Sequence, residues 1–318
     1  MGVSEINLEL SEIFSLLAGY YTIERDKERA RAFKNASLGV AEYNKPIQTG
    51  RQARDDIIGV GESSEQIIDE YLNTGQVRRL QDLEAKYADR KKFTDYFQSF
   101  YGIGPATASK FYDLGFRSIT DSKLQKHLTS AQKTGIVWHE HLKIPIPRNE
   151  MNEIHRKIWD LLTPHNIHFD LAGSYRRSEA TSGDVDILIE HTPNVSMTHI
   201  LEYLRPIIIA ELAVGDVKFM GICRLSEKYA AHRIDIRLID STSYPSALLY
   251  FTGSKRFNIL MRQRAISLGL TLNEYGLYYN PTGEYYPITS EKEVFDLLHV
   301  VEIPPEGRTK TLDSLTFY

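Results

Sequence analysis

Hydrophobic residues recur at helical spacing through the first part of the chain. Near the start, the apolar positions on one face are Ile6, Leu10, Ile13, Phe14 and Leu17. Steps of three and four residues are the period of an amphipathic helix. The same pattern continues to about residue 130 and is interrupted only by short turns that contain glycine. The sequence therefore predicts an all-helical N-terminal half.

The pattern changes after about residue 148. One more helical segment, MNEIHRKIWDLL, is followed by short apolar runs between turn residues, which predict β-strands. These runs are IHFDLAG, DVDILIE, DVKFMGICRL and HRIDIRLID. Further helices are expected in SALLYF and RFNILMRQRAISLG, and GLYYNPTGEYYPI predicts a hairpin that turns at Pro281, Thr282 and Gly283. The expected fold class is a multi-domain α+β protein.

The composition of the chain excludes several classes of protein. A chain of 318 residues is long enough for two or three small cores, and no apolar run approaches the roughly 20 residues of a membrane span. The single cysteine, Cys223, excludes an internal disulfide and a cysteine-based zinc cluster. The first ten residues carry acids where a secretory leader is basic, so we expect no cleaved leader and an intracellular location.

The formal net charge is -4, which argues against a surface that is positively charged all over and binds nucleic acid in that way. Contacts with a polyanion must therefore be local. One basic cluster consists of Arg25, Lys27, Arg29, Arg31 and Lys34. Acidic residues interleave with it, so a solvated helix face explains this cluster equally well.

Two glycine-rich turns separate helices in the N-terminal half. They are Gly59-Val60-Gly61 and Gly102-Ile103-Gly104-Pro105. Such a turn lets the backbone approach a ligand closely and points free amides of the next helix at it. One turn alone would fit a plain connector, but two favour a pair of helix-hairpin-helix motifs. These would hold the sugar-phosphate backbone of DNA without sequence preference.

Three aspartates interrupt otherwise apolar strands. They lie in Gly183-Asp184-Val185-Asp186 and in Arg233-Ile234-Asp235-Ile236-Arg237. Because residues two apart on a strand share a face, Asp184 and Asp186 should project together, while Val185 and the isoleucines face the core. Three uncompensated carboxylates in a partly dry site would repel one another by several kcal/mol. A bound divalent cation would relieve this repulsion, and magnesium fits best.

Magnesium binds a few carboxylates together with substrate phosphates, and two such ions can stabilise both oxygens of an in-line displacement. Gly173-Ser174 follows the predicted strand IHFDLA, where a helix N-terminus with Arg177 nearby would hold a triphosphate. This set of residues predicts nucleotidyl transfer.

The motifs resemble those of the family X DNA polymerases. The segments that carry the resemblance are GVGESSEQIIDEYLNTGQVRRL, YGIGPATASKF, GSYRRSEATSGDVDILI, KFMGICRL, HRIDIRLI, LLYFTGSKRFN and TLNEYGL. Together they cover roughly residues 10 to 300. The family implies a helical lyase-like domain at 1–83, a DNA-binding helical subdomain at 84–147, a nucleotidyltransferase-type palm with a mixed sheet at 148–241 and a small α/β nucleotide-selecting subdomain at 242–318.

The resemblance also implies residue roles. Asp184 and Asp186 would bind both metals, and Asp235 would bind one of them and help to activate the primer 3′-hydroxyl. The incoming dNTP would contact Gly173, Ser174, Arg177, Gly183, Tyr250, Phe251, Gly253 and Asn258. DNA and the nascent base pair would contact Gly59, Gly61, Ser63, Gly102, Gly104, Ala106, Thr107, Lys218, Arg233, Arg262, Glu274 and Tyr275. The expected cofactor is two Mg²⁺ ions, with Mn²⁺ as the alternative.

The sequence departs from the family at a few positions. Relatives that remove a 5′-deoxyribose phosphate use a lysine that forms a Schiff base, and Ile67 stands there instead. Since no lysine occurs between Lys45 and Lys86, we expect this lyase activity to be lost or very weak. Pro145 replaces a triphosphate-binding arginine, Ile259 replaces a lysine near the template base and Lys255 replaces an acid near the incoming base. Fidelity is expected to differ accordingly.

Three other functions share parts of this pattern. An untemplated transferase would need a long loop in the template path, but only SEKYAA joins KFMGICRL to HRIDIRL. A DNA-end scaffold with a vestigial polymerase would not need the complete triad, and an RNA-directed or antibiotic-modifying transferase would not need two hairpins. We expect a monomeric gap-filling polymerase of DNA repair that acts on gapped or primer-template DNA and without a membrane. The resemblance implies a location in the nucleus, and the cytoplasm is the alternative.

Overall fold

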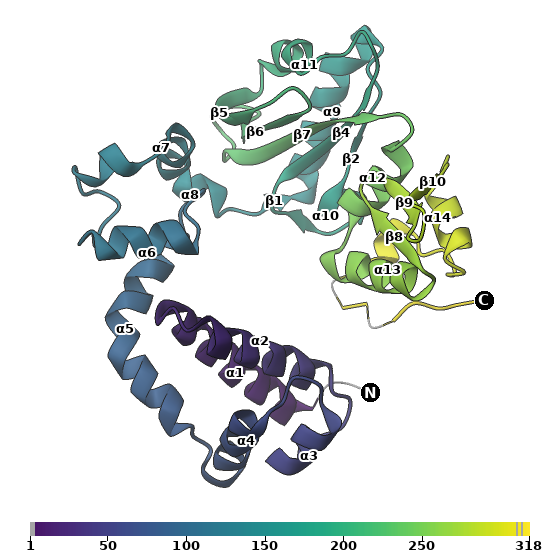
Figure 1. Ribbon diagram of the computed structural model, residues 1–318. Helices are drawn as coiled ribbons and strands as arrows, with labels where there is room; N and C mark the ends of the chain where they lie inside the picture. Colours follow the sequence, from purple (N-terminus) through teal and green to yellow (C-terminus); the bar gives the residue numbers. More distant parts are fainter. Residues whose placement is uncertain (1–3, 310, 313) are drawn as a thin grey trace. The chain divides into compact units, whose positions relative to one another are not determined.

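A computed structural model describes residues 4–309, 311–312 and 314–318 (Figure 1). The chain forms two compact units. The first contains the residues up to Ser99 together with Gly104–Asp121, and the second contains Phe100–Ile103 and the chain from Ser122 onward. The four-part division expected at 1–83, 84–147, 148–241 and 242–318 is a finer division and stays a prediction.

The first unit is wholly helical, as the apolar periodicity predicts. Its helices are α1 (Glu5–Ile23), α2 (Lys27–Glu42), α3 (Gly50–Asp56), α4 (Glu62–Thr74), α5 (Arg78–Gln98) and α6 (Pro105–Asp113). The start of α2 is set by Asp26, whose side chain accepts a hydrogen bond from the amide of Arg29. Helix α4 ends at Gly75, which adopts a left-handed conformation that glycine tolerates best. Apolar side chains of α1, α2 and α4 form one buried core.

Both glycine turns have the predicted arrangement. Gly59, between α3 and α4, has a φ of 100°, and Gly102, between α5 and α6, has a φ of 75°. The second glycine of each turn, Gly61 or Gly104, is the N-cap residue of the helix that follows. Positive φ values favour glycine, and an N-cap without a side chain leaves the first helical amides open.

The second unit begins with short helices and continues as α/β structure. Its helices are α7 (Ser130–Val137), α8 (His139–Leu142), α9 (Arg148–Leu162), α10 (Gly173–Arg176), α11 (Met197–Leu204), α12 (Tyr244–Thr252), α13 (Lys255–Ser267) and α14 (Glu291–Leu297), with 3₁₀ turns at Leu124–His127, Thr163–His165 and Pro305–Gly307. Its strands are β1 (Ile146–Pro147), β2 (Phe169–Leu171), β3 (Thr181–Ser182), β4 (Val185–His191), β5 (Ile208–Val214), β6 (Lys218–Cys223), β7 (His232–Asp240), β8 (Leu270–Asn273), β9 (Gly276–Tyr279) and β10 (Glu284–Tyr286).

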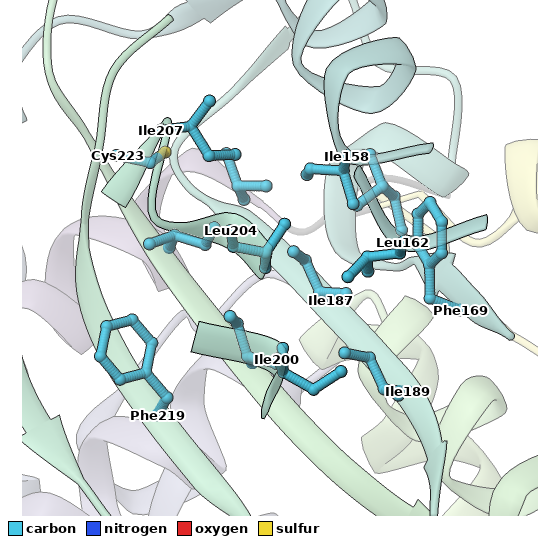
Figure 2. Packing of buried hydrophobic residues seen from close by; sticks show 14 of the residues in the cluster. Ile158, Leu162, Phe169, Ile187, Ile189, Ile200, Leu204, Ile207, Phe219 and Cys223 are labelled. Atoms are coloured by element: carbon cyan, nitrogen blue, oxygen red, sulfur yellow. The ribbon is translucent and has the colours of Figure 1, made fainter. Parts of the chain in front are cut away.

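Five strands form a mixed sheet in the order β2-β4-β7-β6-β5, in which only β4 and β7 pair in parallel. Helices α9 and α11 cover one face. Figure 2 shows Ile158 of α9 and Ile200 of α11 among the side chains that pack around Ile187 and Ile189 of β4. Because strand residues alternate, the even-numbered residues of β4 project to the opposite face. That face is where the acidic residues lie.

The C-terminal part carries a separate three-stranded antiparallel sheet, β10-β9-β8. The turn between β9 and β10 contains Pro281, Thr282 and Gly283, so the hairpin prediction is confirmed.

Strand β5 was not among the predicted strands. In the part of the chain that the structure describes, none of the helices combines the length and the apolar character needed to cross a membrane.

Candidate active site

Parallel pairing of β4 with β7 brings the three aspartates together. Asp186 is the second residue of β4 and stands directly opposite Asp235 of β7, while Asp184 immediately precedes β4. One carboxylate oxygen from each residue lies within 4.8 Å of the others. Val185, Ile234 and Ile236 are fully buried on the opposite face, as the strand parity predicts. In the described residues, no other such group of potential metal ligands occurs.

The negative charges of the three aspartates lie close together and disfavour the ionised form of Asp186 and Asp235. Burial, together with the charges of Asp184 and Asp235, raises the pKa of Asp186 to about 7. Burial also raises the pKa of Asp235, although the Arg233 guanidinium beside it opposes the shift. A pair of partly buried carboxylates whose charges are incompletely balanced is the environment that a divalent cation stabilises.

One arginine partly compensates these charges. Arg233 donates from Nη2 to Asp184 Oδ2 at 2.6 Å and to Asp235 Oδ2 at 3.2 Å. The second oxygen of Asp235, Oδ1, is buried and has no hydrogen-bond partner among the described residues. A buried acceptor without a donor is unfavourable unless something else binds it. Oxygen donors of this kind fit Mg²⁺ or Mn²⁺.

Gly173 lets the backbone approach the carboxylates. It is the first residue of α10 and has a φ of 58°. A Cβ atom at this position would lie 2.4 Å from Asp186 Oδ2, so a side chain would displace the carboxylate. The amides of α10 therefore start directly beside the acidic group, as a triphosphate linked to bound metal ions would require.

We predict that the metal-free protein loses stability as the pH rises from about 4 to 7. The folded state holds a proton on Asp186 up to about pH 7, whereas an unfolded aspartate releases it near pH 3.8. Asp186→Asn removes this penalty, so the variant should be more stable than the natural chain at pH 8 without divalent ions, by on the order of 2 kcal/mol. Urea unfolding at pH 8 and at pH 4.5 measures the difference, which should shrink at the lower pH.

Asp240→Asn provides the control for this prediction. Asp240 lies at the end of the neighbouring strand β7, pairs with His191 at 3.1 Å and has a side chain that is 76% exposed. This variant should follow the natural chain at both pH values. Addition of Mg²⁺ should stabilise the natural chain and not Asp186→Asn, because only ligand binding to the folded state adds stability. Equal stability of the natural chain and Asp186→Asn at pH 8 would contradict the prediction.

A cleft of about 1190 Å³ opens beside the acidic group. All eight residues predicted to contact the dNTP line it, namely Gly173, Ser174, Arg177, Gly183, Tyr250, Phe251, Gly253 and Asn258. Asp184, Asp186 and Arg262 also line it, as do the departures Pro145, Lys255 and Ile259. Residues from α10, the start of β4, α12 and α13 thus share one cavity that can hold a nucleotide.

Arg177 is already positioned by its neighbours. Its guanidinium donates to the carbonyl of Thr252 at 2.5 Å and to the carboxylate of Glu179. Only 9% of the side chain is exposed. Glu179 was not among the predicted site residues, and an acid two positions after an arginine gives no distinguishing signal in the sequence.

A buried ion-pair cluster connects α10 to α14, and the sequence analysis did not identify it. Arg176 Nη2 lies 2.7 Å from Glu291 Oε2, and Arg308 Nη1 lies 2.8 Å from Glu291 Oε1. Arg176 also donates to the hydroxyl of Thr252 at 2.8 Å. The cluster therefore fixes α10 and the end of α12, both of which line the cleft.

The residues predicted to contact DNA lie in several places. Arg262 approaches Glu274 at 3.8 Å, Tyr275 is 60% exposed, and Lys218 is exposed at the start of β6. Arg233 donates hydrogen bonds to Asp184 and Asp235, and its contact with a DNA strand stays a prediction. The remaining predicted contacts lie in the two glycine turns and in the first turns of α4 and α6: Gly59, Gly61, Ser63, Gly102, Gly104, Ala106 and Thr107. Their role in DNA binding stays a prediction.

Family models match almost the whole chain in succession. A helix-hairpin-helix domain matches residues 5–77, and the fingers domain of DNA polymerase lambda matches 95–143. The DNA polymerase beta palm matches 145–241, and the DNA polymerase beta thumb matches 247–309. The acidic group and α10 lie within the palm match. Fold and site together define a protein of the palm, fingers and thumb polymerase class.

Curated relatives agree with this assignment. DNA polymerase lambda of Rattus norvegicus is 30% identical over 326 residues, which cover 95% of this chain and 56% of that protein. DNA polymerase lambda of Arabidopsis thaliana is 26% identical, with coverages of 96% and 62%. The DNA-directed DNA/RNA polymerase mu of Homo sapiens is 26% identical, with coverages of 95% and 69%. The chain belongs to family X of the DNA polymerases, and it spans between about half and two thirds of the length of these relatives.

Proposed function

We propose that this chain is a template-directed, gap-filling DNA polymerase that adds dNMP to a primer 3′-hydroxyl with two bound Mg²⁺ ions. The observation that carries the proposal is the acidic group itself. Three carboxylates within 4.8 Å, one with a buried oxygen lacking a donor, share a site with the predicted triphosphate residues. Phosphoryl transfer requires mainly positioning and charge compensation, and this site provides both.

Each group at the site has a defined task in this proposal. Asp184, Asp186 and Asp235 would hold the divalent ions, which supply positive charge to the reacting phosphate when bound. Ser174 and Arg177 hold the triphosphate at the start of α10. Asp235 would bind one of the two ions and orient the 3′-hydroxyl. The guanidinium of Arg237 lies 4.5 Å from the centroid of the Phe251 ring and stabilises its position. Phe251 limits the space beside the sugar of the nucleotide.

The connection between β6 and β7 favours templated synthesis. It comprises only residues 224–231, and two contacts hold it against the same unit. Tyr229 donates its hydroxyl to Glu153 at 2.7 Å, and the amide of Ala231 donates to His141 Nδ1 at 3.1 Å. This loop is too short to occupy a template path, and its two hydrogen bonds hold it against the rest of the unit.

Primer extension on three substrates tests the proposed function. A one-nucleotide gap should be filled much faster than a recessed primer end is extended, and blunt or single-stranded ends should not be extended. Efficient extension of single-stranded ends would instead support an untemplated transferase. Absence of extension on every substrate, with intact DNA binding, would support a scaffold with a vestigial polymerase.

The first unit has lost the nucleophile of the family's second reaction. Ile67 is 3% exposed and belongs to the apolar core formed by α1, α2 and α4. We propose that 5′-deoxyribose phosphate lyase activity is absent or very weak, because an imine needs an amine nitrogen that this position does not provide.

We predict that Lys255 and Ile259 affect nucleotide selection. Lys255 is the first residue of α13, where the helix dipole disfavours a cation, so its charge is more useful to a bound polyanion than to the helix. Lys255→Asp should raise the KM for dNTP about tenfold, equivalent to about 1.4 kcal/mol. Ile259→Lys should change misinsertion ratios in single-nucleotide assays. The control is Ile266→Lys, which lies on the same helix and outside the cleft. If Lys255→Asp and Ile259→Lys both have the error rates of the natural chain, the hypothesis is wrong.

A further inference from the structure

Tyr101 immediately precedes Gly102 in the second glycine turn, and both residues belong to the second unit. Its side chain packs beside Met220 of β6, with the hydroxyl 4.0 Å from the sulfur atom. Met220 stands directly opposite Asp235 in the antiparallel pairing of β6 with β7, so these two side chains project to the same face of the sheet. Tyr101 therefore connects the turn to the face that carries the aspartates.

The ring of Tyr101 also lies over the guanidinium of Arg233. The Cζ atom of Arg233 is 5.8 Å from the ring centroid, within the range of a cation–π contact. Nη2 of the same guanidinium donates to Asp184 and Asp235, whereas Nε is buried and has no hydrogen-bond partner among the described residues. Burial raises the pKa of Tyr101, so its hydroxyl stays uncharged at neutral pH and the ring presents a neutral aromatic face to Arg233.

The backbone around Tyr101 is fixed by α7. Gln132 donates from its side chain to the carbonyl of Gly102 at 2.8 Å, and only 7% of Gln132 is exposed. Gly135 leaves the space that Tyr101 occupies, because a Cβ atom there would lie 2.7 Å from the Cβ atom of Tyr101. A glycine inside a helix is unfavourable relative to alanine. The close approach of Tyr101 to α7 therefore depends on a residue that helix propensity alone would not select.

We propose that Tyr101 is a positioning residue of the polymerase reaction, whose ring holds Arg233 against its two aspartate partners and so fixes the acidic group relative to the second glycine turn. The inference rests on the proposed function, since Tyr101 itself performs no chemical step. Gly102 is predicted to contact the DNA backbone, so a strand held there would lie at a set distance from the carboxylates. This spacing matters because a misplacement of about 1 Å can slow an enzyme on the order of a hundredfold.

Single-turnover filling of a one-nucleotide gap, at saturating Mg²⁺ and dNTP, tests the proposal. Tyr101→Leu removes the aromatic face and should slow incorporation on the order of tenfold. Tyr101→Phe keeps the ring and should stay within about twofold of the natural rate. Gly135→Ala leaves Tyr101 and Arg233 intact but displaces the ring, so it should slow incorporation in the same direction. Binding of gapped DNA in EDTA should be unchanged in Tyr101→Leu, because this substitution removes no group that is predicted to contact DNA.

A double-mutant cycle tests whether Tyr101 acts through Arg233. In an Arg233→Gln background the guanidinium is absent, so Tyr101→Leu should slow incorporation further by less than about twofold. The matched background is Arg224→Gln, which removes a guanidinium 5.6 Å from the ring centroid of Trp138, a residue that packs on the same apolar side chains as Tyr101. There Tyr101→Leu should still cause its full loss. Equal losses in both backgrounds would overturn the proposal, as would a natural rate in Tyr101→Leu or a rate of Tyr101→Phe as low as that of Tyr101→Leu.

The same cycle measured on stability needs neither metal nor DNA. Both tryptophans, Trp138 and Trp159, lie in the second unit, so their fluorescence during urea unfolding in EDTA at pH 8 reports on this unit. Tyr101→Leu should raise the unfolding equilibrium constant about threefold more in the natural chain than in Arg233→Gln, and equally in the natural chain and Arg224→Gln. A chain that extends no primer would refute the proposed function, while this coupling would still show that Tyr101 holds Arg233. Absence of the coupling would overturn the inference even if the chain polymerises DNA.

Discussion

Asp235→Asn is expected to slow single-nucleotide incorporation about a thousandfold, a loss of roughly 4 kcal/mol of transition-state stabilisation. An amide keeps the shape of the side chain and one oxygen, but it removes the negative charge that, in the proposed function, binds a metal ion and orients the 3′-hydroxyl. Asp235 Oδ1 is buried and has no donor, so the substitution acts at the point where the site requires a cation. Gap filling under single-turnover conditions with saturating dNTP measures the effect on the chemical step.

Asp240→Asn is the matched control, since Asp240 lies on the same strand and its exposed side chain pairs only with His191 among the described residues. Its rate should equal that of the natural chain. Oligonucleotide binding in EDTA should be unaffected by Asp235→Asn, which separates lost catalysis from lost DNA binding. A rate for Asp235→Asn within tenfold of the natural rate would contradict the assignment of this residue as a metal ligand.

The arrangement of the acidic group could be predicted because it depends on local alternation. Charged residues at Asp184, Asp186 and Asp235 alternate with buried valine and isoleucine, so each strand reveals which face its carboxylates occupy. The pairing of the two strands could not be predicted from this alternation. The parallel register that places Asp186 opposite Asp235 depends on contacts between residues 49 positions apart. The resemblance to family X supplied that information, and the structure supplied the distance.

Contacts that depend on a distant, chemically ordinary partner could not be predicted. Glu291 is one acid among 42 acidic residues in the sequence, and its pairing with Arg176 and Arg308 requires α14 to pack beside α10. The hydrogen bonds from Arg233 to two aspartates of its own sheet were not predicted either. Strand β5 was missed because two irregularities in its pairing with β6 disturb the simple alternation on which strand prediction relies.

The other large effect concerns the first unit, where we expect no covalent capture of a 5′-deoxyribose phosphate. Borohydride traps a Schiff base only if an uncharged amine reaches the sugar aldehyde. Ile67 provides none, and the segment between Lys45 and Lys86 contains no lysine. With an incised abasic substrate and borohydride, the natural chain should give at least a thousandfold less trapped product per unit time than a lysine nucleophile would, which corresponds to about 4 kcal/mol. Lys27→Arg and Lys34→Arg show whether either lysine produces any residual signal.

Ile67→Lys and Ile67→Met form a matched pair that tests whether only the amine is missing. Methionine has a similar length and volume without nitrogen and should cost less than about 1.5 kcal/mol of stability. Lysine at a position that is 3% exposed should cost about 3 kcal/mol, but its depressed pKa would leave part of the amine uncharged, and its long stem can reach the surface. We therefore expect trapped product from Ile67→Lys and none from Ile67→Met. Efficient trapping by the natural chain would overturn the proposed loss of the lyase, and trapping by neither variant would show that the sugar-binding surface has been lost together with the nucleophile.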